Sequence, residues 1–286
     1  MYFGSRVPGG GAVNLEDVQG QHDSRGIGLD EVGISGLTYP VSVYDSEHGK
    51  QDTVASVAFS VRLPPDQRGA HLSRFVEVLD DYAGELTPQT IPGVLRALQE
   101  RLGTTAARVD VKFPYFARRR APVTGASAMT HYACGFSASA EGPLYRLELT
   151  ARVPVTSVCP CSKAISDYGA HNQRGYLTIA AALSADQGSE MASLWMGDLI
   201  EAAEASASSA VFPLLKRADE RHVTMQGYNN PVFVEDMVRA VAERLRQDPR
   251  IERFSVEAAN DESIHDHAAF ARLSWPPRSD ESPGPW

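Results

Sequence analysis

The chain has 286 residues and a mass of 31.0 kDa, enough for one large domain or two medium ones with a sizeable hydrophobic core. Its 36 acidic and 27 basic residues give a net charge of −9, which argues against general nucleic-acid binding but allows an anionic small substrate at a local basic cluster. No stretch is apolar over the roughly 18–20 residues that cross a bilayer. Three cysteines are too few for a disulfide framework. We therefore expect a cytoplasmic protein without a membrane or nucleic-acid partner.

The predicted elements run twice through the order strand, strand, helix, helix, strand, strand. Strands are indicated by alternating apolar residues, and helices by apolar residues at helical spacing between capping residues. The elements expected in the first half are a strand over 52–63, a helix from Ser73, a helix from Thr87-Pro88 to Gly103, and strands over 109–115 and 132–136. Those expected in the second half are strands over 145–153 and 176–183, a long helix over about 189–211, a helix from Asn230-Pro231, and strands over 254–258 and 268–273.

Each pair of helices can cover one face of a four-stranded antiparallel sheet. We therefore expect an α+β protein of two tandem ββααββ modules, at about residues 40–140 and 141–275, inside one domain over 27–275. The Gly-rich residues 1–26 and the Pro-rich residues 276–286 are expected to form a flexible lead-in and a flexible tail.

Chemically reactive side chains are concentrated in residues 156–175, between two predicted strands. A cysteine in a polar turn beside Lys163 can have a lowered pKa, which suits Cys159 or Cys161 to be a nucleophile or a metal ligand. Because Cys-x-Cys differs from the zinc knuckle and no second cysteine pair exists, a mixed site of cysteine, histidine and carboxylate ligands is expected. Taken singly, the cysteines are as well explained as turn residues and His171 as a surface residue. Together they favour a site.

Two further groups can complete such a site. His265 and His267 lie two residues apart, so on a strand they would share one face, with one as a ligand and the other moving protons. Glu201 or Glu204, on the long predicted helix, can supply a carboxylate. The alternatives are a solvated turn before a strand for the histidines and a solvated helix face for the glutamates.

Basic residues near these positions can bind phosphate groups. The candidates are Lys163, Arg174, Lys216 and Arg217, with further arginines at 68, 74 and 118–120. In a chain that is acidic overall, several of them must converge to hold a triphosphate. The chain has no Gly-x-x-x-x-Gly-Lys-Ser/Thr loop, so a nucleotide would not be bound as in P-loop proteins.

Taken together, these motifs resemble the type IB GTP cyclohydrolase I family. The segments that carry the resemblance are residues 159–174, 214–220, 230–236 and 262–267, with shorter ones at 17–19, 33–37 and 69–77. The resemblance implies the tunnelling fold and a homotetramer with active sites at subunit interfaces. It also implies hydrolysis of GTP to 7,8-dihydroneopterin triphosphate and formate, the first step of tetrahydrofolate biosynthesis.

The resemblance also implies a role for each matching residue. The implied metal ligands are Cys159, His171, Glu204 and His265. They would hold one divalent ion in each active site, zinc or manganese, with iron as a further alternative. His267, the third catalytic residue beside Cys159 and His171, would protonate the opening imidazole ring. The implied substrate-binding residues are Glu220 for the guanine edge, and Lys163, Arg174, Lys216 and Arg217 for the triphosphate.

Two other functions share part of this pattern. A nitrile reductase of queuosine synthesis has the same fold but forms a thioimidate on a cysteine and uses a reduced nicotinamide cofactor, so its turnover would survive metal chelation. A non-catalytic metal-binding protein would bind copper or zinc through both Cys159 and Cys161 and would not turn over GTP. The sequence departs from the family pattern at residues 225–227, where a glutamate is expected, which weakens the case for a substrate contact there.

Overall fold

The computed structural model describes residues 16–45, 49–142, 144–183 and 194–276. The start of the predicted lead-in, nearly all of the predicted tail and the first residues of the long predicted helix lie outside them. The described part of the lead-in is attached to the domain, because the Gln19 side chain donates to the Ala70 carbonyl at 2.8 Å and the Asp23 amide donates to the Asp66 carbonyl at 2.9 Å. Among the described residues, no helix has the length and apolar character needed to cross a membrane.

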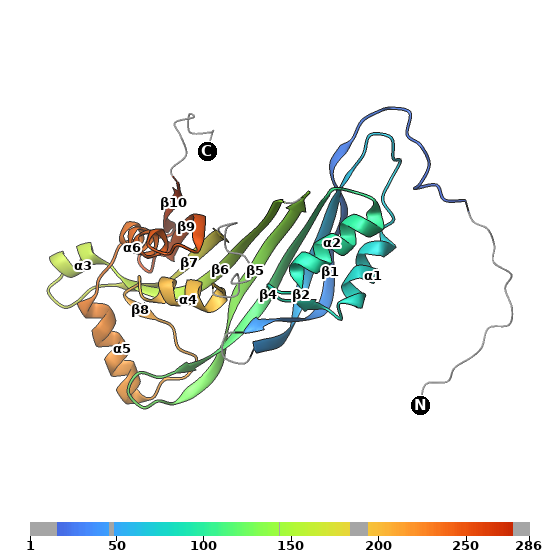
Figure 1. Cartoon of the computed structure of the whole chain (residues 1–286). Helices are drawn as coiled ribbons and strands as arrows, with labels where there is room; N and C mark the ends of the chain where they lie inside the picture. Colours follow the sequence, from blue (N-terminus) through green and yellow to red (C-terminus); the bar gives the residue numbers. More distant parts are fainter. Residues whose placement is uncertain (1–15, 46–48, 143, 184–193, 277–286) are drawn as a thin grey trace, which may run out of the picture.

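A single twisted sheet forms the framework of the molecule (Figure 1). Its strands follow in the order β10-β9-β7-β6-β5-β4-β2-β1-β3, and β8 pairs with β6 beside this path. Neighbouring strands are antiparallel except β1 and β3. The strands are β1 (Leu29–Asp45), β2 (Gly49–Leu63), β3 (Glu85–Leu86), β4 (Ala106–Arg120), β5 (Ser127–Glu141), β6 (Leu144–Val158), β7 (Asn172–Leu183), β8 (Ser209–Ala210), β9 (Ile251–Asp261) and β10 (Ala268–Trp275).

One face of this sheet is apolar from strand to strand. Directly paired residues point to the same face, and Val111 of β4 pairs with Phe136 of β5, which pairs with Leu149 of β6. All three side chains are buried. The alternate positions on β4, such as Arg108 and Lys112, are exposed on the other face. The hydrophobic core therefore lies on one side of the sheet.

Helices cover the apolar face in two groups (Figure 1). The helices are α1 (Ser73–Asp81), α2 (Ile91–Leu102), α3 (Pro160–Ile165), α4 (Met196–Glu204), α5 (Arg217–Asn229) and α6 (Val234–Arg246). The pair α1 and α2 lies over the strands of the first half, while α4 and α6 lie over those of the second. Helix α2 ends at Gly103 as predicted, and the left-handed φ of 65° there is one that glycine adopts without strain.

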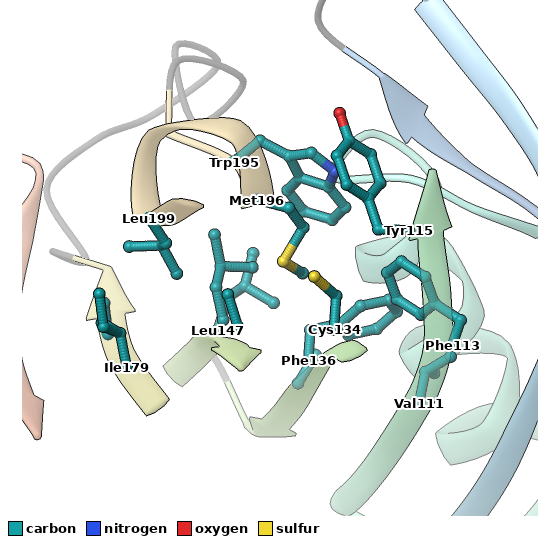
Figure 2. Packing of buried hydrophobic residues seen from close by; sticks show 14 of the residues in the cluster. Val111, Phe113, Tyr115, Cys134, Phe136, Leu147, Ile179, Trp195, Met196 and Leu199 are labelled. Atoms are coloured by element: carbon teal, nitrogen blue, oxygen red, sulfur yellow. The ribbon is translucent and has the colours of Figure 1, made fainter. Parts of the chain in front are cut away.

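The two halves of the chain share one hydrophobic core (Figure 2). Trp195, just before α4, lies against Phe136 of β5 with ring centroids 6.2 Å apart, and against Tyr44 of β1 at 5.8 Å. Cys134 is buried in the same region, and this burial raises the pKa of its thiol to about 12. This cysteine is therefore a packing residue and not a reactive one.

The order of the main elements in each half agrees with the prediction. The two expected four-stranded sheets, however, are joined, because β5 pairs with β6 from Ala133 opposite Arg152 to Glu141 opposite Leu144. The sheet is thus continuous through the middle of the chain. The limits of the modules at about 40–140 and 141–275 stay a prediction.

The predicted order of elements includes a first strand, but the sequence pattern assigns no residues to it; in the structure it is β1. Its pairing with β2 shifts register at two places, between Leu29 and Val32 and between Ile34 and Leu37. Gly36 lies in the second irregularity with a φ of 70°. Such bulges break the alternation by which a strand is recognised, so the apolar pattern of this strand is lost.

The helices of the second half also differ from the prediction. Within the described residues the long helix expected over 189–211 is α4 alone, because the chain then turns so that Ser209 of β8 pairs with Thr156 of β6. Helix α5 is absent from the predicted elements, and within it only Asp219 and Gly227 are buried. A helix without an apolar stripe carries no periodic signal in the sequence. The helix expected from Asn230 is α6, which begins at Val234.

Candidate active site

Cys159 and His171 lie side by side where strand β6 ends and strand β7 begins. Val158, the last residue of β6, pairs with Asn172, the first of β7. The next residues are therefore opposite each other, and the Cys159 amide donates to the His171 carbonyl oxygen at 3.1 Å. The connection between them contains α3, whose first turn is capped by Cys159, with Sγ accepting from the Ser162 amide at 3.4 Å. The register of the sheet thus makes Cys159 and His171 neighbours through their backbones.

The loop between β9 and β10 reaches the same place. One ring nitrogen of His171, Nδ1, lies 2.9 Å from Oε1 of Gln173 and 3.4 Å from Oγ of Ser263. Ser263 belongs to this loop, at residues 262–267. Two of the three motifs that the sequence analysis singled out, the cysteine segment and the histidine segment, are therefore in contact.

A network of buried, hydrogen-bonded polar side chains lies next to His171. Gln173 on β7 and Asn260 on β9 donate through their side-chain amides to Oγ of Ser157 on β6, at 2.9 and 2.8 Å. All three residues are buried. The sequence pattern assigns none of them a role, although Ser157 and Gln173 lie in the reactive segment 156–175. Their signal is a polar residue at an inward-facing position near the end of an apolar strand, a placement that usually requires hydrogen-bond partners.

His265 and His267 are exposed in the turn before β10, so they are not on the strand itself. Their rings are nevertheless stacked, with centroids 5.1 Å apart and planes inclined by 17°. They are thus close to each other, and their loop contacts His171 through Ser263.

Glu204 lies in a different environment. It is the last residue of α4, and its carboxylate forms an ion pair with Arg119 of β4 and accepts a hydrogen bond of 2.8 Å from the Tyr132 hydroxyl of β5. Burial raises the pKa of Tyr132, although the charge of Arg119 opposes this, so the hydroxyl remains a donor. Glu201, on the same helix, is exposed.

The described residues do not assemble a complete set of metal ligands. In this part of the chain, no group of three or more histidine, cysteine, aspartate or glutamate side chains is arranged to hold a metal ion. The structure brings Cys159 and His171 together with the loop of His265, and it leaves Glu204 bound to Arg119.

Lys163, predicted to bind phosphate, makes contacts inside the chain. Its ammonium group lies 4.3 Å from the ring centroid of Tyr228, near the end of α5, and donates to the Tyr228 carbonyl oxygen. Lys163 thereby joins α3 to α5. Such a cation–π contact contributes about 0.5–1 kcal/mol at an exposed site.

The other predicted substrate-binding residues are exposed. Lys216, Arg217 and Glu220 lie at the beginning of α5, and Arg174 lies on β7. Along the axis of α5, Glu220 is about 12 Å from Tyr228, given a rise of 1.5 Å per residue. Figure 1 shows this beginning of α5 near the turn between β4 and β5, away from α3. In a single chain, Lys216, Arg217 and Glu220 therefore lie at the opposite end of α5 from Lys163.

Asp219 fixes the beginning of α5 to the turn between β4 and β5. It is fully buried and accepts hydrogen bonds from the amides of Val123, Thr124 and Lys216, each at 2.9 Å, and from the Thr124 hydroxyl at 2.6 Å. Burial alone would raise the pKa of Asp219, but these hydrogen bonds outweigh it and hold the pKa well below its usual range. Asp219 is therefore a structural carboxylate.

Solved structures define the class of fold. A hyper-thermostable AgUricase mutant has a TM-score of 0.51 with 10% sequence identity, covering 89% of this chain and 95% of that chain. A hyperthermostable mutant of Bacillus sp. TB-90 urate oxidase has a TM-score of 0.50 with 10% identity, covering 86% and 99%. At such low identity the similarity shows the fold alone, which is the α+β tunnelling fold with a single large, mostly antiparallel sheet.

Sequence comparisons then define the family. The family model described as "Type I GTP cyclohydrolase folE2" matches residues 15–271. GTP cyclohydrolase FolE2 of Magnetococcus marinus is 42% identical over 265 residues, covering 93% of this chain and 97% of that protein. GTP cyclohydrolase FolE2 of Pseudothermotoga lettingae is 45% identical over 257 residues, covering 90% and 97%. The chain belongs to the type I GTP cyclohydrolase FolE2 family, which confirms the resemblance stated above.

Proposed function

We propose that this chain hydrolyses GTP to 7,8-dihydroneopterin triphosphate and formate, the first step of tetrahydrofolate biosynthesis, at the site around Cys159 and His171. Membership of the FolE2 family supports the reaction. The observation that carries the location is the pairing of these two residues at the ends of β6 and β7, in contact with the loop of His265 and His267.

We further propose that Cys159 and His171 hold a divalent ion, zinc or manganese, with His265 and Glu204 as the remaining ligands. The donor set fits, because a thiolate and an imidazole are ligands that zinc prefers and an added carboxylate widens the choice to harder ions. The chemistry that such an ion would supply is a lowered pKa of water, which would make water a nucleophile toward carbon 8 of guanine. Glu204 reaches the ion only if its ion pair with Arg119 opens, so the exposed Glu201 remains the alternative ligand.

The chain's own residues would complete the chemistry. His267 donates a proton to the imidazole nitrogen of guanine as the bond from that nitrogen to carbon 8 breaks. The nitrogen therefore does not have to leave as an anion. Glu220 accepts the two adjacent N–H groups of the guanine edge. Lys163, Arg174, Lys216 and Arg217 neutralise the triphosphate.

We propose that the chain works as a homotetramer of bimodular subunits, with each active site shared between subunits. Large apolar residues are exposed close to the site. Ile165, the last residue of α3, is 85% exposed, and Tyr168, which follows the helix, is 100% exposed; Met225 and Tyr228 on α5 are 45% and 42% exposed. A monomer rarely leaves such side chains together in water, so a second copy covering α3 and α5 is the arrangement that they favour. The free thiols of Cys159 and Cys161 favour a reducing compartment, and we place the protein in the cytoplasm.

GTP turnover by the purified, metal-free protein tests the proposal. Zinc or manganese is added back, and formate release and the fluorescence of the oxidised pterin are followed together. Both products should appear only with metal and should disappear in Cys159→Ala. Turnover that survives chelation would contradict metal dependence, and metal binding without either product would favour the non-catalytic alternative.

A further inference from the structure

We propose that Gln173 is a positioning residue that fixes the tautomer of His171 and so decides which ring nitrogen is offered to a metal ion. The inference rests on the proposed function, in which His171 is a ligand. It is carried by three contacts of the Gln173 side chain, which is only 7% exposed.

The contacts of Gln173 are directional. Its Oε1 lies 2.9 Å from His171 Nδ1, while its Nε2 lies 2.9 Å from Ser157 Oγ and 3.5 Å from Glu262 Oε1. Oxygen and nitrogen of a glutamine amide are told apart by their partners. A carboxylate can only accept hydrogen bonds, so the group that Gln173 turns toward Glu262 must be the NH₂ group.

The orientation of this amide determines the state of the imidazole. With the NH₂ group toward Glu262, the carbonyl oxygen of Gln173 faces Nδ1 of His171. A carbonyl oxygen can only accept, so Nδ1 carries the hydrogen and Nε2 keeps the lone pair that a metal ion requires. Histidine ligands in metalloproteins are commonly oriented by such a partner on the other nitrogen.

The rest of the network holds Gln173 in place. Ser157 Oγ accepts from Gln173 and from Asn260, so both of its lone pairs face amide donors. Asn260 in turn lies against Gly175, where an added Cβ would come within 2.1 Å of Asn260 Oδ1. Gly175 therefore has to remain a glycine for Asn260 to occupy this position, and the chain of contacts extends from the sheet backbone to the His171 ring.

The decisive experiment measures the tautomer without metal or substrate. The ring nitrogens of His171 are observed by nitrogen-15 NMR in the full-length, metal-free protein at about pH 8.5, well above the ordinary imidazole pKa of about 6.5. Zinc affinity is measured separately by competition with a chromophoric chelator. The wild type should show hydrogen on Nδ1. Gln173→Met, which keeps the volume but loses the acceptor, should move the hydrogen to Nε2 in most molecules and weaken zinc binding by about 10- to 100-fold.

Two further variants make the test specific. Glu262→Gln, at a half-buried position in the loop between β9 and β10, removes the carboxylate that orients Gln173 and should give a mixture of tautomers. Gln51→Met, the matched control, removes a glutamine that bonds the Phe116 backbone on β4, and should change neither the tautomer nor zinc affinity. Hydrogen on Nε2 in the wild type, or wild-type zinc affinity in folded Gln173→Met, would overturn the proposal. Absence of GTP turnover in the wild type with the expected tautomers would refute the proposed function alone.

Discussion

Replacing Arg119 with methionine tests whether Glu204 can serve as a metal ligand. The Glu204 side chain is 9% exposed and the Arg119 side chain 29% exposed, so their ion pair lies between the surface and the interior. The hydrogen bond from Tyr132 is the other contact of the carboxylate. In Arg119→Met the carboxylate keeps this bond and loses its countercharge.

The expected magnitude follows from the burial of the pair. Breaking an exposed ion pair costs about 0–1 kcal/mol and breaking a buried one about 3–5 kcal/mol, so an intermediate pair is worth about 2–3 kcal/mol. The free energy of unfolding of the metal-free variant should fall by this amount. If Glu204 must leave Arg119 to bind the ion, the wild type loses the same free energy on binding and the variant does not. Since 1.4 kcal/mol corresponds to a factor of ten, zinc should bind the variant about 30- to 140-fold more tightly.

Two measurements decide the outcome: urea denaturation of the metal-free protein, and zinc affinity from competition with a chelator. Arg120→Met is the matched control, because Arg120 is the next residue on β4 and is exposed on the other face of the strand. Adding Glu204→Gln to Arg119→Met should abolish the gain in zinc affinity. Unchanged or weaker zinc binding in Arg119→Met would refute the role of Glu204, and a loss of affinity in Glu201→Gln would then identify the alternative ligand.

Three further predictions concern packing and titration. Trp195→Ala should lower the free energy of unfolding by about 3–5 kcal/mol. Trp195→Phe should lower it by much less, because the buried indole N–H that phenylalanine lacks has no hydrogen-bond partner among the described residues. Urea denaturation measures both effects. Asp219→Asn should destabilise the protein by weakening the contact with Thr124. Because the folded-state pKa of Asp219 is lowered, its contribution is fully present above the unfolded pKa of about 3.9 and is lost as the pH falls from there through the lower folded pKa. The stabilities of wild type and variant should therefore begin to approach each other only below about pH 4 in acid unfolding curves. At about pH 8, iodoacetamide should alkylate the exposed Cys161 but not the buried Cys134, as mass spectrometry of the peptides would show.

The elements that the sequence predicts well are those whose own residues supply a regular signal. Helix α2 has apolar residues at helical spacing, a proline near its start and Gly103 at its end, and the structure agrees. Helix α5 has no such signal, because its contacts are made by Asp219 at one end and Tyr228 at the other. The two register shifts in the pairing of β1 with β2 hide β1, because they break its alternation of apolar residues. For α5 the missing information lies in contacts with distant segments, and for β1 it lies in the irregular register with its neighbour.

The candidate site, too, can be predicted from the sequence only in part. The spacing of Cys159 and His171 marks a chemical cluster, and the structure adds that the register of β6 and β7 makes them neighbours. No sequence pattern reveals that Glu204 is paired with Arg119, since 85 residues separate them (204 minus 119) and either charge alone suits a solvated surface. Side-chain partners across a sheet depend on the fold, whereas reactive residue types can be recognised before it is known.

If Lys163 binds the triphosphate as proposed, the contacts of α5 link substrate binding to the position of this helix. A polar helix of 13 residues is only marginally stable by itself. Since only two residues of α5 are buried, its stability depends on the contacts at its two ends. Lys163 provides one of them, giving one of its three N–H groups to the Tyr228 carbonyl oxygen and facing the Tyr228 ring with its charge. A triphosphate bound by Lys163 would therefore share this ammonium group with the end of α5. Under this proposal, binding of the nucleotide and docking of α5 against α3 would act on the same side chain.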